Sequence, residues 1–132
     1  MSKIEGSNII GVFPGLHFGT NQDEFMIVVA HWDTVLHSPG FDDNGSGMSA
    51  LLEIARALST SSIRQDECKT RKNSVILAAL DLEEVGTHGA MAFLHEFFVP
   101  KILQAYDFPN LKVHFLLTQW KKLPVVRTSN IN

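Results

Sequence analysis

Two short and almost wholly apolar runs constrain the fold of this chain more than any other feature of its sequence. They are "EFMIVVAHW", residues 24–32, and "SVILAAL", residues 74–80. A continuous apolar run of this length is typical of a strand buried on both faces, as in a parallel sheet covered by helices. Between them, "NGSGMSALLEIARALST", residues 44–60, has the period of an amphipathic helix. This order of strand, helix and strand predicts a sheet with parallel members.

The remaining segments extend the same alternation. Residues 7–13 read as a short strand that ends in a turn, residues 88–106 as a helix that Pro100 limits or kinks, and residues 111–117 as a last strand. We therefore expect an α/β fold, a three-layer sandwich in which helices flank a mixed, mostly parallel sheet. The side chains expected on the core faces of the helices are Met48, Leu51, Leu52, Ala55, Leu58, Phe93, Phe97 and Phe98.

Composition narrows the class of protein. The 132 residues suffice for one modest domain, and 45% of them are hydrophobic, as in a globular protein. A net charge of −3 gives no basic surface for nucleic acid. No apolar run approaches the roughly 20 residues of a membrane span, and the first residues do not resemble a signal peptide. Cys68 is the only cysteine, so we expect an exposed free thiol and no internal disulfide. Compartment and oligomeric state stay open.

Potential metal ligands follow both apolar strands. His31 and Asp33 come at the end of the first, and Glu83 and Glu84 come shortly after the second. Ligands of open α/β sheets collect at the carboxyl ends of the strands. Because His31 and Asp33 are two residues apart, Asp33 could orient the imidazole ring. Adjacent glutamates diverge, so one of them can bind metal while the other acts as a general base.

A third acidic pair, Asp42 and Asp43, precedes the helix in "FDDNGSG". By itself this stretch is most simply a turn and helix cap, and an isolated Glu pair is most simply solvated. The coincidence of all three clusters at predicted strand ends favours a metal site. Of the remaining side chains, His37 and His88 are expected not to touch metal, His95 and His114 to be packing or surface residues, and Trp32 to be packed or to wall the site.

Three stretches resemble the zinc metallopeptidases of family 28, relatives of bacterial leucyl aminopeptidases, glutamate carboxypeptidase and glutaminyl cyclases. They are "SNIIGVFPG", "IVVAHWDTVLHSPGFDDNGSGMSALLEIARAL" and "VILAALDLEEVGTHGAMAFL", in the order that the family has them. Together they cover about residues 7 to 99. The resemblance implies hydrolysis of a peptide substrate by a hydroxide that two zinc ions share.

The resemblance also assigns a role to each of five residues. His31 matches a ligand of one zinc ion, and Asp33 matches the carboxylate that supports this histidine. Asp43 matches the ligand that bridges the two ions, with Asp42 as the second choice. Glu83 matches the general base, and Glu84 matches a ligand of the other zinc ion.

The family's catalytic domain is longer than this chain and takes two further ligands, an Asp at the end of the next strand and a distant His. No Asp follows Asp107 here, and no His follows His114. Each ion would therefore keep two protein ligands, His31 and Asp43 for one and Glu84 and Asp43 for the other. Catalytic zinc usually has three protein ligands and a water, so the resemblance implies weak binding and little catalysis by this chain.

The codons of "VHFLLTQWKK", residues 113–122, offer a reason for the missing Asp. Read one base earlier, they can encode Gly-Ala-Phe, two apolar residues and then Asp-Thr, which resembles the family segment that carries this ligand. We therefore expect residues 7–112 to be the family-like part of a partial catalytic domain spanning 1–132. Residues from about 113 to 132 would be an atypical tail from a shifted reading frame or from alternative splicing.

Three functions remain open at this point. The first is a zinc-dependent exopeptidase of the aminopeptidase type. The second is a non-catalytic fragment or binding module with an incomplete metal site. The third is an enzyme like the glutaminyl cyclases on the same scaffold.

Overall fold

A computed structural model of the chain describes residues 5–63, 71–104 and 112–117. Its strands are β1 (Ile9–Phe13), β2 (Glu24–His31), β3 (Val75–Leu80) and β4 (Lys112–Leu117). The helical elements are η1 (Phe41–Gly45), α1 (Ser46–Ile63), α2 (His88–Ala92) and η2 (Phe93–Leu103). Cys68 and most of the predicted tail lie outside the described residues. Among the described helices, none is both long and apolar enough to cross a membrane.

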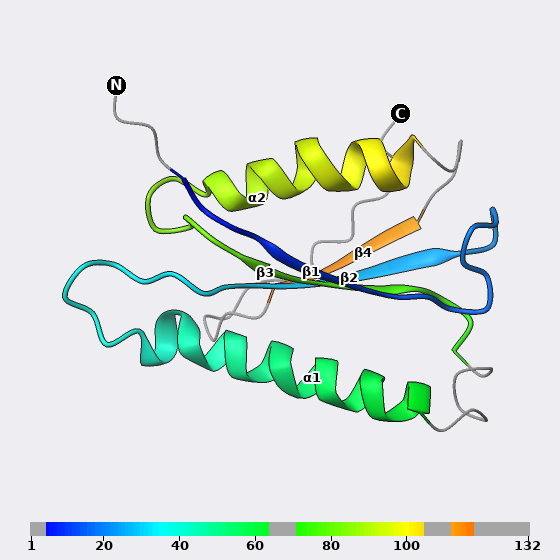
Figure 1. Cartoon of the computed structure of the whole chain (residues 1–132), viewed down its shortest axis with the longest axis horizontal. Coiled ribbons are helices and arrows are strands. Elements are labelled where there is room, and N and C mark those ends of the chain that lie inside the picture. Colours follow the sequence, from blue (N-terminus) through cyan, green and yellow to red (C-terminus); the bar gives the residue numbers. More distant parts are fainter. Residues whose placement is uncertain (1–4, 64–70, 105–111, 118–132) are drawn as a thin grey trace.

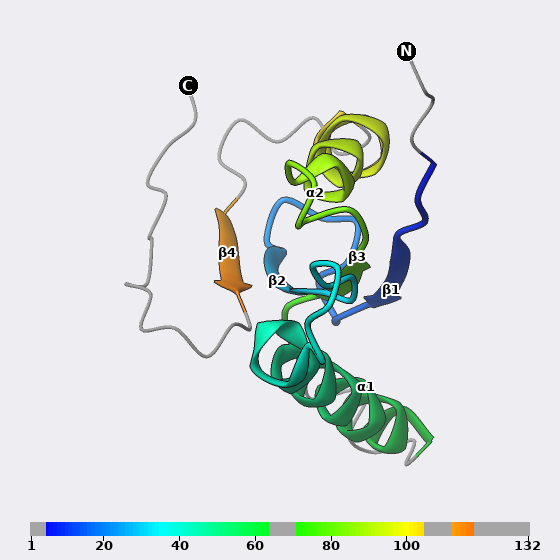
Figure 2. The ribbon, with the colours of Figure 1, turned by 90° about the vertical axis from the view of Figure 1, so that its left-hand side faces the viewer.

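The four strands form one mixed sheet in the order β1-β3-β2-β4. The central pair β2 and β3 is parallel, β4 is parallel to β2, and β1 is antiparallel to β3. Helix α1 covers one face of the sheet, and α2 with η2 covers the other (Figures 1 and 2). This arrangement confirms the predicted three-layer α/β fold with a mostly parallel sheet.

Strand β2 is buried on both faces because its side chains alternate between two cores. Phe25, Ile27 and Val29 lie in the core with Phe93 and the rest of η2. Val28 and Ala30 lie in the other core, against α1. From Ile27 to Ala30 the strand therefore has no solvated face, which is why this stretch is apolar at every position, whereas Met26, nearer its start, is 48% exposed.

One predicted core position on α1 is wrong. Leu51 is 4% exposed, whereas Leu52 is 63% exposed, and Ile54 packs against the core in its place. At 3.6 residues per turn, Leu52 is rotated about 100° from Leu51, whereas Ile54 is about 60° away on the other side. The apolar stripe of α1 is therefore centred on Leu51, and Leu52 lies outside it.

The second helix departs from the expectation for proline. Pro100 lies inside η2, and the helix continues to Leu103 in π-helical form. The N–H of Gln104 donates to the carbonyl of Val99 at 3.0 Å, a bond that spans five residues. Phe93 and Phe98 are buried on this element and Phe97 packs beside them, as predicted.

Candidate metal centre

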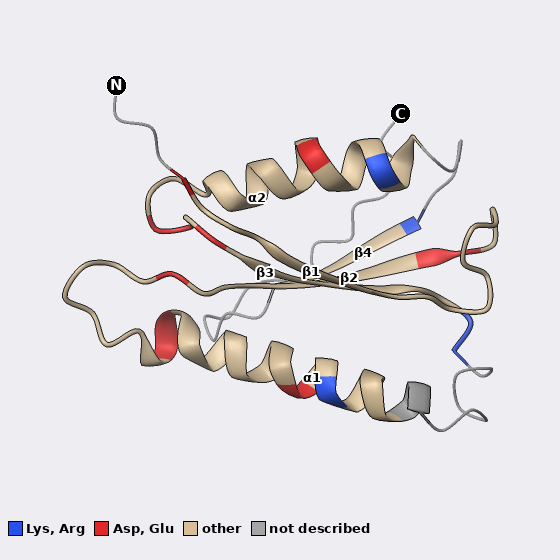
Figure 3. Ribbon diagram, in the orientation of Figure 1, with Lys and Arg blue, Asp and Glu red and all other residues tan. Residues whose placement is uncertain are grey.

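Many of the acidic positions lie on the side of the ribbon where β2 and β3 end (Figure 3). The carboxyl ends of these two parallel strands lie side by side, with His31 opposite Leu80. The N–H of Trp32 donates to the carbonyl of Leu80 at 2.9 Å and extends the pairing by one residue. Residues about 50 positions apart in the sequence therefore meet at one edge of the sheet.

His31 is the buried centre of the site, with 7% of its side chain exposed. Its Nδ1 lies 3.1 Å from the backbone carbonyl oxygen of Asp33, and its Nε2 lies 3.0 Å from Oδ1 of Asp43. The carbonyl of Asp33 accepts a proton on Nδ1, and the carboxylate of Asp43 accepts one on Nε2, the place that a metal ion would take between them. Metal-binding histidines are commonly held in this way, with one nitrogen bonded to the protein and the other free for the ion.

Asp33 joins the end of β2 to the loop that follows β3. Its carboxylate oxygens accept the backbone N–H groups of Glu83 at 3.1 Å and of Glu84 at 3.0 Å. Oδ1 also lies 3.4 Å from Nδ1 of His31. Burial raises the pKa of Asp33, but the N–H groups of Glu84 and Glu83 and the nearby His31 outweigh it, so the pKa lies below its ordinary value. Asp33 is therefore an anion that ties the imidazole and both glutamates together.

The two glutamates stand on a tight loop between β3 and α2. The N–H of Thr87 donates to the carbonyl of Glu83 at 2.8 Å, and the N–H of His88 donates to that of Leu82 at 3.0 Å. Leu82 and Thr87 both have left-handed backbones, with φ of 55° and 56°. A non-glycine residue in this region costs about 1 kcal/mol or more, so the surroundings must hold the loop in place.

The loop brings His31, Glu83 and Glu84 within reach of a common ion. One ligand atom from each lies within 4.8 Å of the others. Two atoms bound to one tetrahedral zinc ion at about 2.1 Å lie about 3.4 Å apart, so side-chain rotations would have to draw the group closer around an ion. An imidazole nitrogen and carboxylate oxygens are ligands that zinc accepts. The donor set therefore fits the expected metal.

Asp43 approaches the same histidine from η1. Its side chain is 46% exposed and contacts Nε2 of His31, the nitrogen available to a metal. The side-chain oxygen of Asn44 accepts the N–H of Gly47 at 3.1 Å and so caps the start of α1. Asp42 is exposed, and its backbone carbonyl accepts the hydroxyl of Ser46 at 2.8 Å. Among the described residues, the ligand atoms of His31, Glu83 and Glu84 form one group. Asp43 is joined to this group through Nε2 of His31, and Asp33 is joined to it through His31 and the backbone of both glutamates.

The four other histidines considered from the sequence stand apart from this group. His37, His88 and His95 are exposed, and His114 lies on β4, where its Nε2 is 3.8 Å from Glu24. Trp32 is half-exposed, and its indole N–H donates to the carbonyl of Ser7 at 3.3 Å. All four histidines lie outside the group formed by His31, Glu83 and Glu84.

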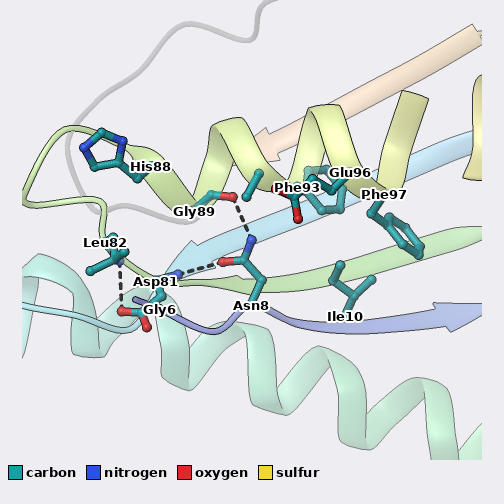
Figure 4. Close-up of a pocket in the computed structure, with 11 residues that line it drawn as sticks. Gly6, Asn8, Ile10, Asp81, Leu82, His88, Gly89, Phe93, Glu96 and Phe97 are labelled. Atoms are coloured by element: carbon teal, nitrogen blue, oxygen red, sulfur yellow. Dashed lines mark hydrogen bonds between the residues drawn. The ribbon is translucent and has the colours of Figure 1, made fainter. Parts of the chain in front are cut away.

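Sequence reasoning missed a second feature of this edge, a pocket of about 500 Å³ between β1 and α2. Figure 4 shows Asn8 inside it, between Asp81 and Gly89. The signal in the sequence is weak: Asn8 directly precedes the first strand, and Asp81 is the first polar residue after "VILAAL". Neither residue type at these positions indicates a contact across the sheet.

Comparison with known proteins identifies the family. The model of peptidase family M28 matches residues 8–111. The chain belongs to peptidase family M28. This match confirms the resemblance seen in the three sequence stretches. No solved structure gave a significant match.

Two relatives within the M28 family are similar to this chain. Aminopeptidase YwaD of Bacillus subtilis is 30% identical over 115 residues, which cover 87% of this chain and 23% of the relative. The vacuolar membrane protease of Debaryomyces hansenii is 36% identical over 87 residues, which cover 66% of this chain and 8% of the relative. The chain thus spans less than a quarter of the length of the curated relatives that it matches.

Proposed function

We propose that this chain carries the first half of the catalytic centre of a zinc-dependent exopeptidase of the aminopeptidase type, acting on peptides. The observation that carries the proposal is the convergence of His31, Glu83 and Glu84 within 4.8 Å at the end of two parallel strands. Structural turns and caps explain none of these contacts, because the three residues come from segments about 50 positions apart. The name of the B. subtilis relative supports the aminopeptidase type.

In this proposal, each of the five residues at this edge has its own role in peptide hydrolysis. His31, Asp43 and Glu84 would hold two zinc ions, with Asp43 shared. Bound zinc acidifies water and polarises the carbonyl of a peptide bond. Glu83 takes the proton from the attacking water and delivers it to the departing amine. Asp33 fixes the imidazole ring of His31 and, through the two N–H groups that it accepts, the backbone of both glutamates.

A zinc titration tests this proposal on the chain itself. We expect His31→Ala to lower zinc affinity by about tenfold or more, because it removes the only buried imidazole at this edge of the described fold. His37→Ala is the matched control and should leave the affinity unchanged, since His37 is exposed and outside the group. Isothermal titration calorimetry of the metal-free chain measures both. If wild-type chain binds no zinc, or binds it equally well without His31, the non-catalytic alternative replaces the proposal.

We also propose that the segment from about Val113 onward is read in a shifted frame. The family match ends at residue 111, directly before this segment. Sequencing of the transcript and its locus across the codons of Leu111 to Lys122 should reveal one added or missing base, and its correction should restore an Asp after the strand. A confirmed frame without such a base would contradict this proposal and would leave each zinc ion with two protein ligands.

A further inference from the structure

Asn8 joins three separate elements through one side chain. Its Oδ1 accepts the backbone N–H of Asp81 at 3.0 Å, at the end of β3. Its Nδ2 donates to the backbone carbonyl of Gly89 at 2.7 Å, at the start of α2 (Figure 4). Asn8 itself directly precedes β1, which runs antiparallel to β3 with Ile9 opposite Ala79. Because β1 and β3 are antiparallel, the residue before β1 lies beside the carboxyl end of β3, and this residue is Asn8.

The two partners of Asn8 flank the loop that carries Glu83 and Glu84. The chain enters this loop after Asp81 and leaves it before Gly89, so the amide of Asn8 closes the loop at its base. At the opposite side, the carboxylate of Asp33 holds the N–H groups of both glutamates. The loop is therefore restrained from two sides by side chains that lie outside it.

Such restraint is needed because the loop is strained. Leu82 and Thr87, one at each end of it, have positive φ although neither is glycine. Strained backbone of this kind persists only where the surroundings over-determine it, and it is common at functional sites. A backbone held in place by Asn8 and Asp33 alike can keep the two adjacent carboxylates near His31.

Gly89 provides the close approach on which the bridge depends. A Cβ atom at this position would lie 2.0 Å from the carbonyl oxygen of Asp81 and 2.7 Å from Oδ1 of Asn8. Only glycine lets the start of α2 come so near the end of β3. At this separation, the short amide of Asn8 reaches both backbones at once.

We propose that Asn8 is a positioning residue, which fixes the Glu83–Glu84 loop so that Glu84 faces the two-zinc site beside His31. This inference rests on the proposed function for its zinc-binding part. Asn8 does not touch the metal ligands in the structure; it acts on them through the backbone at Asp81 and Gly89. The alternative is a purely structural role, in which Asn8 stabilises the fold without affecting the zinc site.

The test compares Asn8→Ala with a control bridge at the other end of the sheet. Asp23, which is buried, accepts the N–H of Ser74 at 2.9 Å and its hydroxyl at 2.6 Å, and so links β2 to β3 far from the loop. Asp23→Ala should destabilise the fold without changing the loop. Asn8→Asp is a second variant that retains the size of the side chain and replaces the donor to Gly89 by a charged acceptor.

Two readouts separate positioning from general stability. In metal-free protein, ¹⁵N–¹H NMR should show shifted amide resonances of Glu83 and Glu84 and faster hydrogen exchange in both Asn8 variants, but not in Asp23→Ala. Zinc affinity should fall by about tenfold in the Asn8 variants and stay unchanged in Asp23→Ala. Unmoved amides, or moved amides with wild-type zinc affinity, would overturn the inference. If wild-type chain itself binds no zinc, the proposed function fails, while the amide readout still decides whether Asn8 sets the loop.

Discussion

Replacing Glu83 by glutamine should lower kcat for peptide-bond hydrolysis by about 10²- to 10⁴-fold, the usual contribution of a general acid–base residue. Glutamine has the shape of glutamate but cannot take a proton from water. The backbone N–H of residue 83 still donates to Asp33, so the loop should keep its conformation. The measurement is the hydrolysis of an aminoacyl 4-nitroanilide by the form of the protein whose restored frame carries the remaining zinc ligands, with the zinc content determined alongside.

Two controls give this result its meaning. Glu84→Gln should lose zinc together with activity, which separates a ligand from a base. Glu96→Gln should change neither the zinc content nor the activity. Glu96 is an exposed residue of η2 that lines the pocket between β1 and α2. Full activity of Glu83→Gln would remove Glu83 from the mechanism. Cyclisation of an N-terminal glutamine substrate in place of hydrolysis would favour the glutaminyl cyclase alternative.

The elements that sequence alone predicts well are those whose side chains face a single kind of environment. Strands β2 and β3 are buried on both faces, so their apolar runs show where they lie and that they are parallel. The carboxyl ends of parallel strands must then lie at one edge, which is how His31 and Glu84 could be placed together before their geometry was known. The places of His31, Asp33, Glu83 and Glu84 at this edge follow from that constraint, whereas Asp43 is placed by η1, before α1.

Contacts that depend on backbone geometry could not be predicted from the sequence. The left-handed backbone of Thr87 has no signal, because threonine rarely adopts it and the strain is sustained by other segments. Asn8 reads as an ordinary residue before a strand, since its partners Asp81 and Gly89 are more than 70 residues away. The prediction that Leu52 is buried was wrong for a related reason. A helical pattern with several apolar residues does not by itself determine which of them lies at the centre of the buried stripe.

Nothing in the sequence marks Gly89 as important either. Of the substitutions proposed, its replacement should lower the free energy of unfolding the most. Gly89→Ala should lower the free energy of unfolding by about 3 kcal/mol or more. The new methyl group would lie 2.0 Å from the carbonyl oxygen of Asp81 and 2.8 Å from its nitrogen, and neither backbone atom can rotate away. The start of α2 must therefore move off the end of β3, which breaks the bridge through Asn8 as well. Urea unfolding of metal-free protein measures this loss.

Gly11→Ala on β1 is the matched control, because it adds the same methyl group where there is room. The nearest atom would be in the ring of Phe13 at 3.5 Å, an ordinary contact with a side chain. Alanine also lowers the conformational entropy of the unfolded chain relative to glycine, which stabilises the fold by about 0.4–1 kcal/mol. The free energy of unfolding of this variant should therefore stay within about 1 kcal/mol of the wild-type value. Equal stability of the two variants would mean that α2 does not pack against the end of β3 as closely as the structure has it. The loop that carries Glu83 and Glu84 would then lose the restraint at its base, and the geometry proposed for the zinc site would fail with it.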